Sequence, residues 1–208
     1  MGRLDGKVAV ITGATSGIGL RTAEVFVAEG ARIVIAGRRA PEGEALAQQL
    51  GSNCVFRQTD VTVEEQMQAL IALAVEKFGR IDCLFNNAGG PAQTGGIEGL
   101  DVERFDAAMA TLVRSVMLGM KHAAPTMRKQ GFGSIINNGS IAGRLAGFSS
   151  SMVYGAAKAA VIHFTKCVAM ELGESGIRVN SISPGAIATG ISARRSGCRP
   201  TPPRRPPP

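Results

Sequence analysis

The sequence predicts an α/β fold: a Rossmann-type, doubly wound parallel sheet of six strands with helices on both faces. Three features of the chain support this prediction. Short apolar runs alternate strictly with segments of helical periodicity, the connections between them are short, and the first run leads into a glycine-rich turn. Such alternation is typical of a parallel sheet, because each crossover helix packs back onto the sheet.

Each predicted strand is a run of four to six residues, and the first, Lys7 to Thr12, is apolar and β-branched as in a parallel strand buried on both faces. The predicted strands cover residues 7–12, 32–36, 54–58, 83–86, 134–137 and 178–183. Helical spacing of apolar residues predicts helices over residues 18–29, 41–50, 62–78, 101–129 and 153–174. Gly30 ends the first helix, Pro41 lies in the first turn of the second, and Asp101 caps the fourth. Thr62 and Glu65 fit a capping box that opens the third helix.

We expect one domain over residues 1–191, followed by a disordered tail over residues 192–208. The tail holds six of the ten prolines and no apolar periodicity, so it can form neither a helix nor a central strand. Its stretch Pro203-Arg-Arg-Pro206 fits a polyproline ligand for an SH3-like module, although compositionally simple ends commonly bind nothing specific.

The net charge of +7 is concentrated in this tail. Residues 192–208 contain five arginines and no acidic residue, which leaves a net charge of +2 for residues 1–191. The domain therefore lacks the strongly basic balance of a nucleic-acid-binding protein, and we expect no nucleic-acid partner. Binding of nucleic acid through the tail is an alternative that rests on the tail's charge alone.

Cysteine spacing and hydropathy indicate a cytoplasmic protein. The four cysteines lack the spacing of a disulfide framework or a metal site, and the two histidines are isolated, so we expect free thiols and no metal. No run approaches the roughly 18 apolar residues of a membrane span, and residues 1–7 do not resemble a secretion signal. We therefore expect neither secretion nor a membrane partner.

The turn after the first strand reads Thr12-Gly-Ala-Thr-Ser-Gly-Ile-Gly19 and leads into a helix. In this context Gly13 allows a sharp turn, Gly17 allows close approach of a pyrophosphate, and Gly19 allows the helix to pack against the strand. The turn therefore indicates nucleotide binding. The alternative is a glycine-rich connection without a ligand.

Tyr154, the only tyrosine, precedes Lys158 by four residues. On a helix this spacing places both side chains on one face, where an ammonium group favours the phenolate and lowers the tyrosine pKa. The pair is a candidate acid–base device. Taken alone, such a pair is more often an ordinary surface tyrosine and lysine, because short motifs match by chance.

These motifs together resemble the short-chain dehydrogenases/reductases. In chain order they are Thr12-Gly-x-x-x-Gly-x-Gly19, Asn86-Asn-Ala-Gly89, Ser140, Tyr154-x-x-x-Lys158 and Pro184-Gly185. The resemblance covers residues 4 to about 191. Each motif alone is weak, but five motifs in the family's order and approximate spacing are specific.

The resemblance implies three catalytic residues. Tyr154 would exchange the proton on the substrate oxygen while hydride moves to or from a nicotinamide. Lys158 would hold the nicotinamide ribose and lower the tyrosine pKa, and Ser140 would hydrogen-bond the substrate oxygen. Ser140 follows a predicted parallel strand, where α/β sheets bind ligands. Its alternative role is that of a loop serine capping a local backbone group.

The resemblance also implies the cofactor contacts, with Asp60 against the adenine. For Asp60 the alternative is helix capping, which Thr62 already supplies. The implied cofactor-binding residues are Gly13, Thr15, Ser16, Gly17, Ile18, Gly19, Arg38, Arg39, Asp60, Val61, Asn87, Ala88, Gly89, Tyr154, Lys158, Pro184, Gly185, Ile187 and Thr189.

Residues 37–39 favour NADP(H) over NAD(H). An NAD site has an acidic residue about 20 positions after the glycine turn, where this chain has Gly37 followed by Arg38 and Arg39. Guanidinium groups suit a 2′-phosphate. Against this preference, Ser16 is neutral where many NADP-dependent relatives carry a base, and Arg39 could be a solvated surface charge.

The chain departs from the family's pattern twice. Spacing places Leu112 where the family has an asparagine that helps to hold a water near the lysine. After residue 191 the family's substrate-covering segment and seventh strand are missing, so we expect an exposed apolar edge strand with Val179 and Ile182.

The expected function is interconversion of a ketone or other carbonyl compound and a secondary alcohol with NAD(P)(H). The alternative is a truncated, cofactor-binding pseudoenzyme or a non-functional product with little turnover. The family's mode of assembly implies at most a homodimer, formed through the long helices at about 104–129 and 153–174 that flank the fifth strand.

Overall fold

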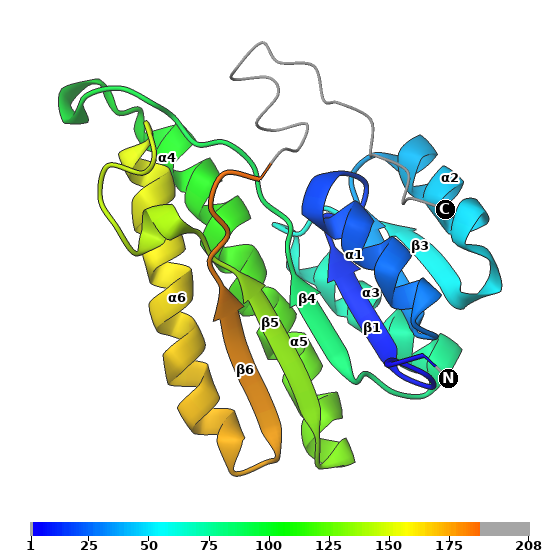
Figure 1. Cartoon of the computed structure of the whole chain (residues 1–208). Coiled ribbons are helices and arrows are strands. Elements are labelled where there is room, and N and C mark those ends of the chain that lie inside the picture. The colour runs from blue at the N-terminus through cyan, green and yellow to red at the C-terminus, as the bar shows by residue number, and fades with distance from the viewer. Residues whose placement is uncertain (1, 188–208) are drawn as a thin grey trace, which may run out of the picture.

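The structure, a computed structural model, describes residues 2–187 and forms a three-layer α/β domain (Figure 1). The strands are β1 (Val8–Thr12), β2 (Arg32–Gly37), β3 (Cys54–Gln58), β4 (Cys83–Asn86), β5 (Gly133–Asn138) and β6 (Ile177–Ile182). They form one parallel sheet in the order β3-β2-β1-β4-β5-β6. The prediction of a six-stranded, Rossmann-type parallel sheet is confirmed for the described part of the chain.

The helices cover both faces of this sheet. They are α1 (Gly17–Ala28), α2 (Ala40–Leu50), α3 (Glu64–Phe78), α4 (Val102–Met109), α5 (Ser115–Gln130) and α6 (Met152–Gly173). Alternate residues of β1 enter different cores: Ile11 packs in a cluster with residues of α1 and α2, whereas Val10 packs with residues of α3, α5 and α6. All five residues of β1 are buried, which explains why its sequence is continuously apolar up to Thr12.

The order of the strands places a topological switch point between β1 and β4. The connection from β1 leads to β2 on one side, and the connection from β3 returns to β4 on the other. Ligands of open α/β sheets bind at the carboxyl ends of the strands beside such a point. The loops after β1, β4 and β5 are therefore the natural place for a site.

The predicted helix over residues 101–129 is interrupted by a π-helical turn. Asp101 caps α4 as expected, because its Oδ1 accepts a hydrogen bond from Arg104 N at 2.8 Å. Residues Ala110–Arg114 form the π-helical turn, and α5 follows directly. Such π-bulges frequently occur at functional sites.

The predicted capping box at Thr62 is wrong. Val63 occupies the cap position of α3 and makes no side-chain cap bond. The Thr62 hydroxyl instead donates to Asp60 Oδ1 at 2.7 Å, and Thr62 N donates to the same oxygen at 2.9 Å. Because Asp60 and Thr62 hydrogen-bond each other, neither of them caps the helix.

The prediction that β6 is an edge strand with Val179 and Ile182 exposed is correct for Ile182 and wrong for Val179. Within residues 2–187, β6 pairs with β5 alone. Ile182 is 41 % exposed, but Val179 is buried because its side chain points into the core shared with α6.

Three cysteines lie in the described part of the chain, and all are free thiols, as expected. Burial raises the pKa of Cys54 and of Cys83 to about 12, so both stay protonated. No helix among residues 2–187 is long and apolar enough to cross a membrane. The predicted tail, residues 192–208, lies outside the described residues.

Candidate functional site

A cavity of about 830 Å³ opens at the carboxyl ends of the strands and brings most of the predicted site residues together. Those that line it are Gly13, Thr15, Ser16, Gly17, Ile18, Arg38, Arg39, Asp60, Val61, Asn87, Ala88, Gly89, Ser140, Tyr154, Lys158, Pro184, Gly185 and Ile187. Gly19 does not line the cavity, and Thr189 lies outside the described residues. The cavity has the size of a small-molecule or cofactor pocket.

The glycine turn forms one wall of the cavity, and its conformation requires glycine. Gly13 and Gly17 have φ angles of +67° and +57°, which favour residues without a Cβ atom. A Cβ atom on Gly13 would lie 2.7 Å from Ala88 Cα, and one on Gly19 would collide with the Gly13 carbonyl. Gly19 therefore serves packing of α1, as its place in the motif predicts.

The donor set of this wall fits a phosphate group. Thr15, Ser16 and Gly17 line the cavity at the N-terminus of α1, whose first turn contains no acidic residue. Backbone N–H groups and the positive end of the helix dipole favour an anion here. The residues present thus fit the pyrophosphate of a dinucleotide.

At the end of β2 the cavity has two arginines and no carboxylate at position 37. Arg39 Nη2 donates to the carbonyl and hydroxyl oxygens of Thr15, both at 3.0 Å, and Nη1 lies 3.0 Å from Glu42 Oε1. Arg39 is therefore not a purely solvated surface charge, although its side chain is half exposed. A Cβ atom on Gly37 would lie 2.7 Å from Thr15 Cγ2, so this position has no room for an acidic side chain unless Thr15 moves.

Asp60 lies in the same part of the cavity as Arg38. Hydrogen bonds from Thr62 to the Asp60 carboxylate hold the pKa of Asp60 below its ordinary value, and the positive charge of Arg38 lowers it further. The Asp60 backbone N–H donates to Gln66 Oε1 at 2.7 Å. The carboxylate is thus ionised and fixed at the edge of the cavity.

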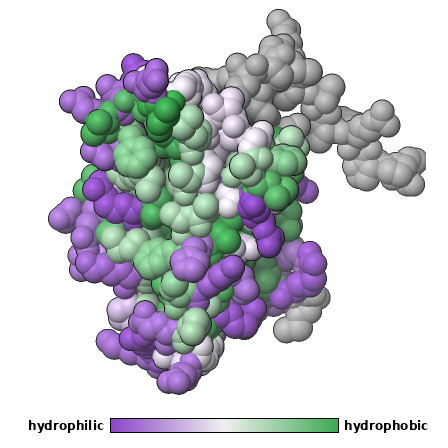
Figure 2. All heavy atoms as spheres, turned by 90° about the vertical axis from the view of Figure 1, so that its left-hand side faces the viewer, coloured by the Kyte–Doolittle hydropathy of each residue, from purple (hydrophilic) through white to green (hydrophobic). Residues whose placement is uncertain are grey.

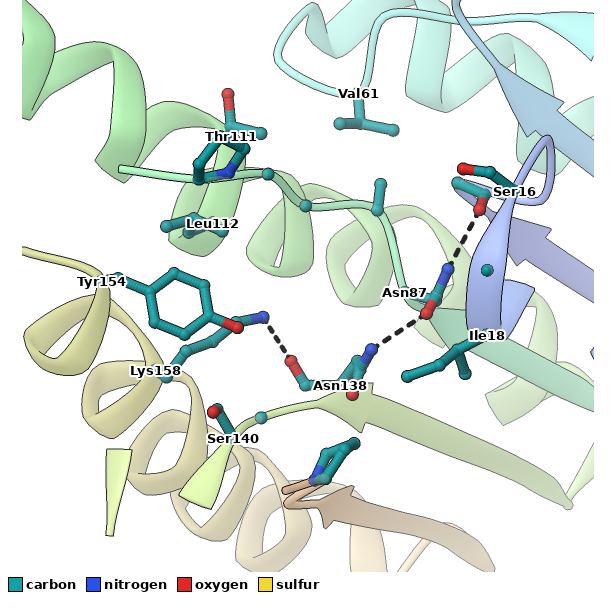
Figure 3. Close-up of a pocket in the computed structure, with 18 of the residues that line it drawn as sticks. Ser16, Ile18, Val61, Asn87, Thr111, Leu112, Asn138, Ser140, Tyr154 and Lys158 are labelled. Atoms are coloured by element: carbon teal, nitrogen blue, oxygen red, sulfur yellow. Dashed lines mark hydrogen bonds between the residues drawn. The ribbon is translucent and has the colours of Figure 1, made fainter. Parts of the chain in front are cut away.

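Tyr154, Lys158 and Ser140 meet at the other end of the cavity (Figure 3). Tyr154 and Lys158 are one turn apart on α6, and Ser151 fixes the start of that helix by accepting a hydrogen bond from Tyr154 N at 3.1 Å. Lys158 Nζ lies 5.7 Å from the centre of the Tyr154 ring. Ser140 follows β5, and its Oγ accepts a hydrogen bond from Ala142 N at 3.2 Å.

Lys158 is a buried cation. Its side chain is 4 % exposed, and burial lowers its pKa to about 8. Lys158 Nζ donates to the main-chain carbonyl of Asn138 at 2.6 Å. The lysine is therefore held in place beside Tyr154 without a carboxylate partner among the described residues.

Leu112 lies on the π-helical turn at Ala110–Arg114 and lines the cavity. It is 1 % exposed and packs with Val153 and Ala157 of α6. A Cβ atom added to Gly89 would lie 3.4 Å from Leu112 Cδ2 and 3.9 Å from Lys158 Nζ, so both side chains border Gly89. An apolar side chain at this place cannot hydrogen-bond a water molecule.

Sequence reasoning missed Asn138 and Thr12. Asn138 lines the cavity and supplies the carbonyl that receives Lys158. The buried Thr12 hydroxyl accepts hydrogen bonds from Asn87 N and Ala88 N, both at 3.0 Å, and so fixes the loop after β4. Their positions could have indicated a role in the site, because both residues are polar and lie at the carboxyl end of a strand.

Comparisons with known proteins agree on one family. The family model for short chain dehydrogenase matches residues 7–197. The chain is 39% identical over 194 residues to short-chain dehydrogenase reductase 3a of Arabidopsis thaliana, covering 92% of this chain and 75% of that protein. It is 42% identical over 200 residues to trans-4-hydroxycyclohexanecarboxylate dehydrogenase of Sinomonas cyclohexanicum, covering 92% and 76%. The crystal structure of levodione reductase superimposes with a TM-score of 0.89 at 34% identity, covering 93% of this chain and 76% of that one.

Proposed function

Because the chain belongs to the short-chain dehydrogenase family of oxidoreductases, we propose that it interconverts a carbonyl compound and a secondary alcohol by hydride transfer. One observation carries the proposal. Tyr154, Lys158 and Ser140 open into the same cavity as the glycine turn at the N-terminus of α1. A proton donor and a dinucleotide can thus face one substrate.

A nicotinamide bound in this cavity would supply or accept the hydride. In the reduction, the Tyr154 hydroxyl donates its proton to the carbonyl oxygen, and in the oxidation it takes that proton back from the alcohol. Ser140 Oγ donates a hydrogen bond to the same oxygen and fixes its position. The two hydroxyl groups orient the substrate and stabilise the charge that develops on its oxygen.

Lys158 acts through its charge and its donors. The ammonium lowers the free energy of the Tyr154 phenolate and so eases proton transfer in both directions. Burial strengthens this effect, since the effective dielectric constant around the buried lysine is low. Its N–H groups can also hold a ribose hydroxyl, in addition to the Asn138 carbonyl.

We favour NADP(H), with Arg38 as the residue that selects it. Arg39 is already bonded to Thr15 and Glu42, and position 37 has no carboxylate. Arg38→Asp should therefore reverse the preference between NADPH and NADH, measured by fluorescence titration with both cofactors. An unchanged ratio of the two dissociation constants would refute the role of Arg38.

The substrate end of the cavity suits an apolar ring. Pro91, Leu112, Ile141 and Phe148 line the cavity, and none of them carries a charge. The similar proteins include one named (+)-borneol dehydrogenase 2, from Salvia officinalis, and one named trans-4-hydroxycyclohexanecarboxylate dehydrogenase. We propose alicyclic ketones and their secondary alcohols as the substrate class.

Turnover of such compounds tests the proposal. The wild-type protein should oxidise NADPH with at least one member of a panel of cyclic ketones. Tyr154→Phe should reduce that rate by about 10²–10⁴-fold, the usual contribution of a general acid. The variant should still bind NADPH, measured as a rise in its melting temperature when NADPH is added. Retained binding would show that the site is still folded.

A second candidate function is cofactor binding with little turnover, and Leu112 favours it. The leucine fills the space beside Lys158 and Gly89 with an apolar group, so it holds no water there. This candidate predicts that NADPH raises the melting temperature while wild type and Tyr154→Phe are equally inactive. A clear difference in rate between the two proteins would exclude it.

We further propose a homodimer through α5 and α6. Figure 2 shows the α6 side of the molecule, where apolar surface extends between polar margins. Met170 on α6 is 84 % exposed, and beside it Arg128 Nη2 of α5 lies 2.7 Å from Glu171 Oε1. Large exposed apolar side chains of this kind are typical of a protein–protein interface.

A further inference from the structure

Two side-chain amides connect the glycine turn to the catalytic end of the cavity. Asn87 Nδ2 donates to the carbonyl oxygens of Thr12 and Gly13, at 3.0 and 3.1 Å. These two acceptors fix the orientation of the Asn87 amide, so its Oδ1 faces the other way. That oxygen accepts a hydrogen bond from Asn138 Nδ2 at 2.9 Å (Figure 3).

The orientation of Asn138 follows from that of Asn87. A flipped Asn138 amide would bring two carbonyl oxygens together, which is unfavourable. Asn138 is the last residue of β5, and its main-chain carbonyl receives Lys158 Nζ at 2.6 Å. An ordered path thus runs from Gly13 through Asn87 and Asn138 to Lys158.

Asn138 is a costly residue at this place. Its Oδ1 is buried and has no hydrogen-bond partner among the described residues. A buried acceptor without a partner destabilises the fold. An apolar side chain of similar size would remove this oxygen but would also leave Asn87 Oδ1 without its donor, so the asparagine is explained by its contact with Asn87.

We propose that Asn138 is a positioning residue that holds the acceptor of Lys158 and ties it, through Asn87, to the glycine turn. The inference deepens the proposed function, because it names what positions the lysine of that site. Asn87 makes no described contact with Lys158, yet a change at Asn87 should alter the position of Lys158 through Asn138. Tyr154 is the titratable group whose ring the ammonium faces.

The test measures Lys158 directly, without turnover. Lysine is labelled with ¹³C at Cε, the Lys158 signal is assigned by its loss in Lys158→Met, and its pKa is obtained by NMR titration. Asn138→Ala loosens the carbonyl that stabilises the ammonium, so the pKa of Lys158 should fall. We expect a shift of roughly half a unit, a change of about 3-fold in the acid dissociation constant.

Asn87→Ala should also lower the pKa of Lys158. The double variant Asn87→Ala/Asn138→Ala should lower it little further than either single variant, because all three variants break the same path. Asn180→Ala is the matched control, since Asn180 is exposed on β6, and it should leave the lysine unchanged. Circular dichroism checks the fold, and Asn138→Leu replaces Asn138→Ala if the latter does not fold.

An unchanged or raised pKa of Lys158 in folded Asn138→Ala or Asn138→Leu would overturn the proposal, as would additive effects of the two alanine substitutions. Failure of the proposed function is a separate result. If the wild type reduces no carbonyl compound, the NMR titration still reports whether Asn138 positions Lys158.

Discussion

At the scale of residues, burial of the Lys158 ammonium in the site lowers the stability of the fold. The ammonium is almost completely buried and has a main-chain carbonyl, not a carboxylate, as its acceptor. Its pKa falls from 10.5 to about 8 because burial disfavours the charged form. The same buried charge lies 5.7 Å from the centre of the Tyr154 ring.

Replacement of the lysine should therefore stabilise the protein. Below pH 8 Lys158 is charged in both the folded and the unfolded chain, so the cost of its burial is present in full. Between pH 8 and 10.5 the folded chain has lost the proton and the unfolded chain has not, and stability rises with pH.

Lys158→Met should raise the free energy of unfolding by about 1–3 kcal/mol at pH 7, since loss of the hydrogen bond offsets part of the gain. The gain should shrink at pH 10. Urea denaturation at both pH values measures it, and a loss of stability at pH 7 would contradict the account.

At the scale of elements, the glycine turn is the part whose shape depends most strictly on residue type. Gly13 combines a positive φ with a close approach to Ala88. Gly51 has a similar φ of +75° but no atom within 4 Å of an added Cβ. An alanine at Gly51 would introduce backbone strain alone, whereas an alanine at Gly13 would introduce strain and a steric clash at the site.

Gly13→Ala should abolish detectable binding of NADPH, because the added methyl group displaces the loop after β4. Gly51→Ala should lose about 1–3 kcal/mol of stability, because φ +75° with ψ −159° is a region that favours glycine, while it keeps its affinity for NADPH. Fluorescence titration and thermal melting of both variants provide the comparison. Equal affinities in the two variants would show that the turn does not shape the site.

Most elements could be predicted from the sequence, because their periodicity is local. All six strands and the capping of α4 by Asp101 appear in the structure as expected. The π-helical turn was not predictable, since the sequence of Ala110–Arg114 has an ordinary helical pattern. The capping box predicted at Thr62 is wrong because the Thr62 hydroxyl hydrogen-bonds Asp60 of the preceding loop and not the helix backbone.

The candidate site was predictable in its residues but not in its connections. Motif spacing pointed to about half of the residues that line the cavity, and the others, such as Pro91, Asn138 and Phe148, belong to no motif. The path from Gly13 through Asn87 and Asn138 joins the carboxyl ends of β1, β4 and β5 to Lys158 of α6, and no local pattern records which amide faces which carbonyl. Such contacts follow from the strand order and register of the sheet, which become visible only in the fold.

At the scale of the whole molecule, the length of α6 separates the site from Met170 of the proposed interface. The cavity lies at the carboxyl ends of the strands, while Met170 lies near the other end of α6. In Figure 1, α6 lies at the outer side of the sheet beside β6, and α2 lies at the opposite side. Assembly through α6 therefore leaves the glycine turn open to a cofactor.

Met170→Arg should convert the proposed dimer into a monomer, because a charge would be buried without a partner in the interface. Size-exclusion chromatography with light scattering measures the mass. Gln48→Arg on the exposed surface of α2 is the matched control and should stay dimeric. A monomeric wild type, or a dimeric Met170→Arg, would refute the proposed interface.

The central claim is that this cavity transfers hydride with Tyr154 as the proton donor, and isotope transfer tests it most directly. NADPH carrying deuterium at the transferable position of the nicotinamide is incubated with a cyclic ketone, and the alcohol is analysed by mass spectrometry. The account predicts deuterium on the alcohol carbon with wild type and at least 100-fold less with Tyr154→Phe, in line with the usual effect of about 10²–10⁴. Equal deuterium incorporation by both proteins would contradict it.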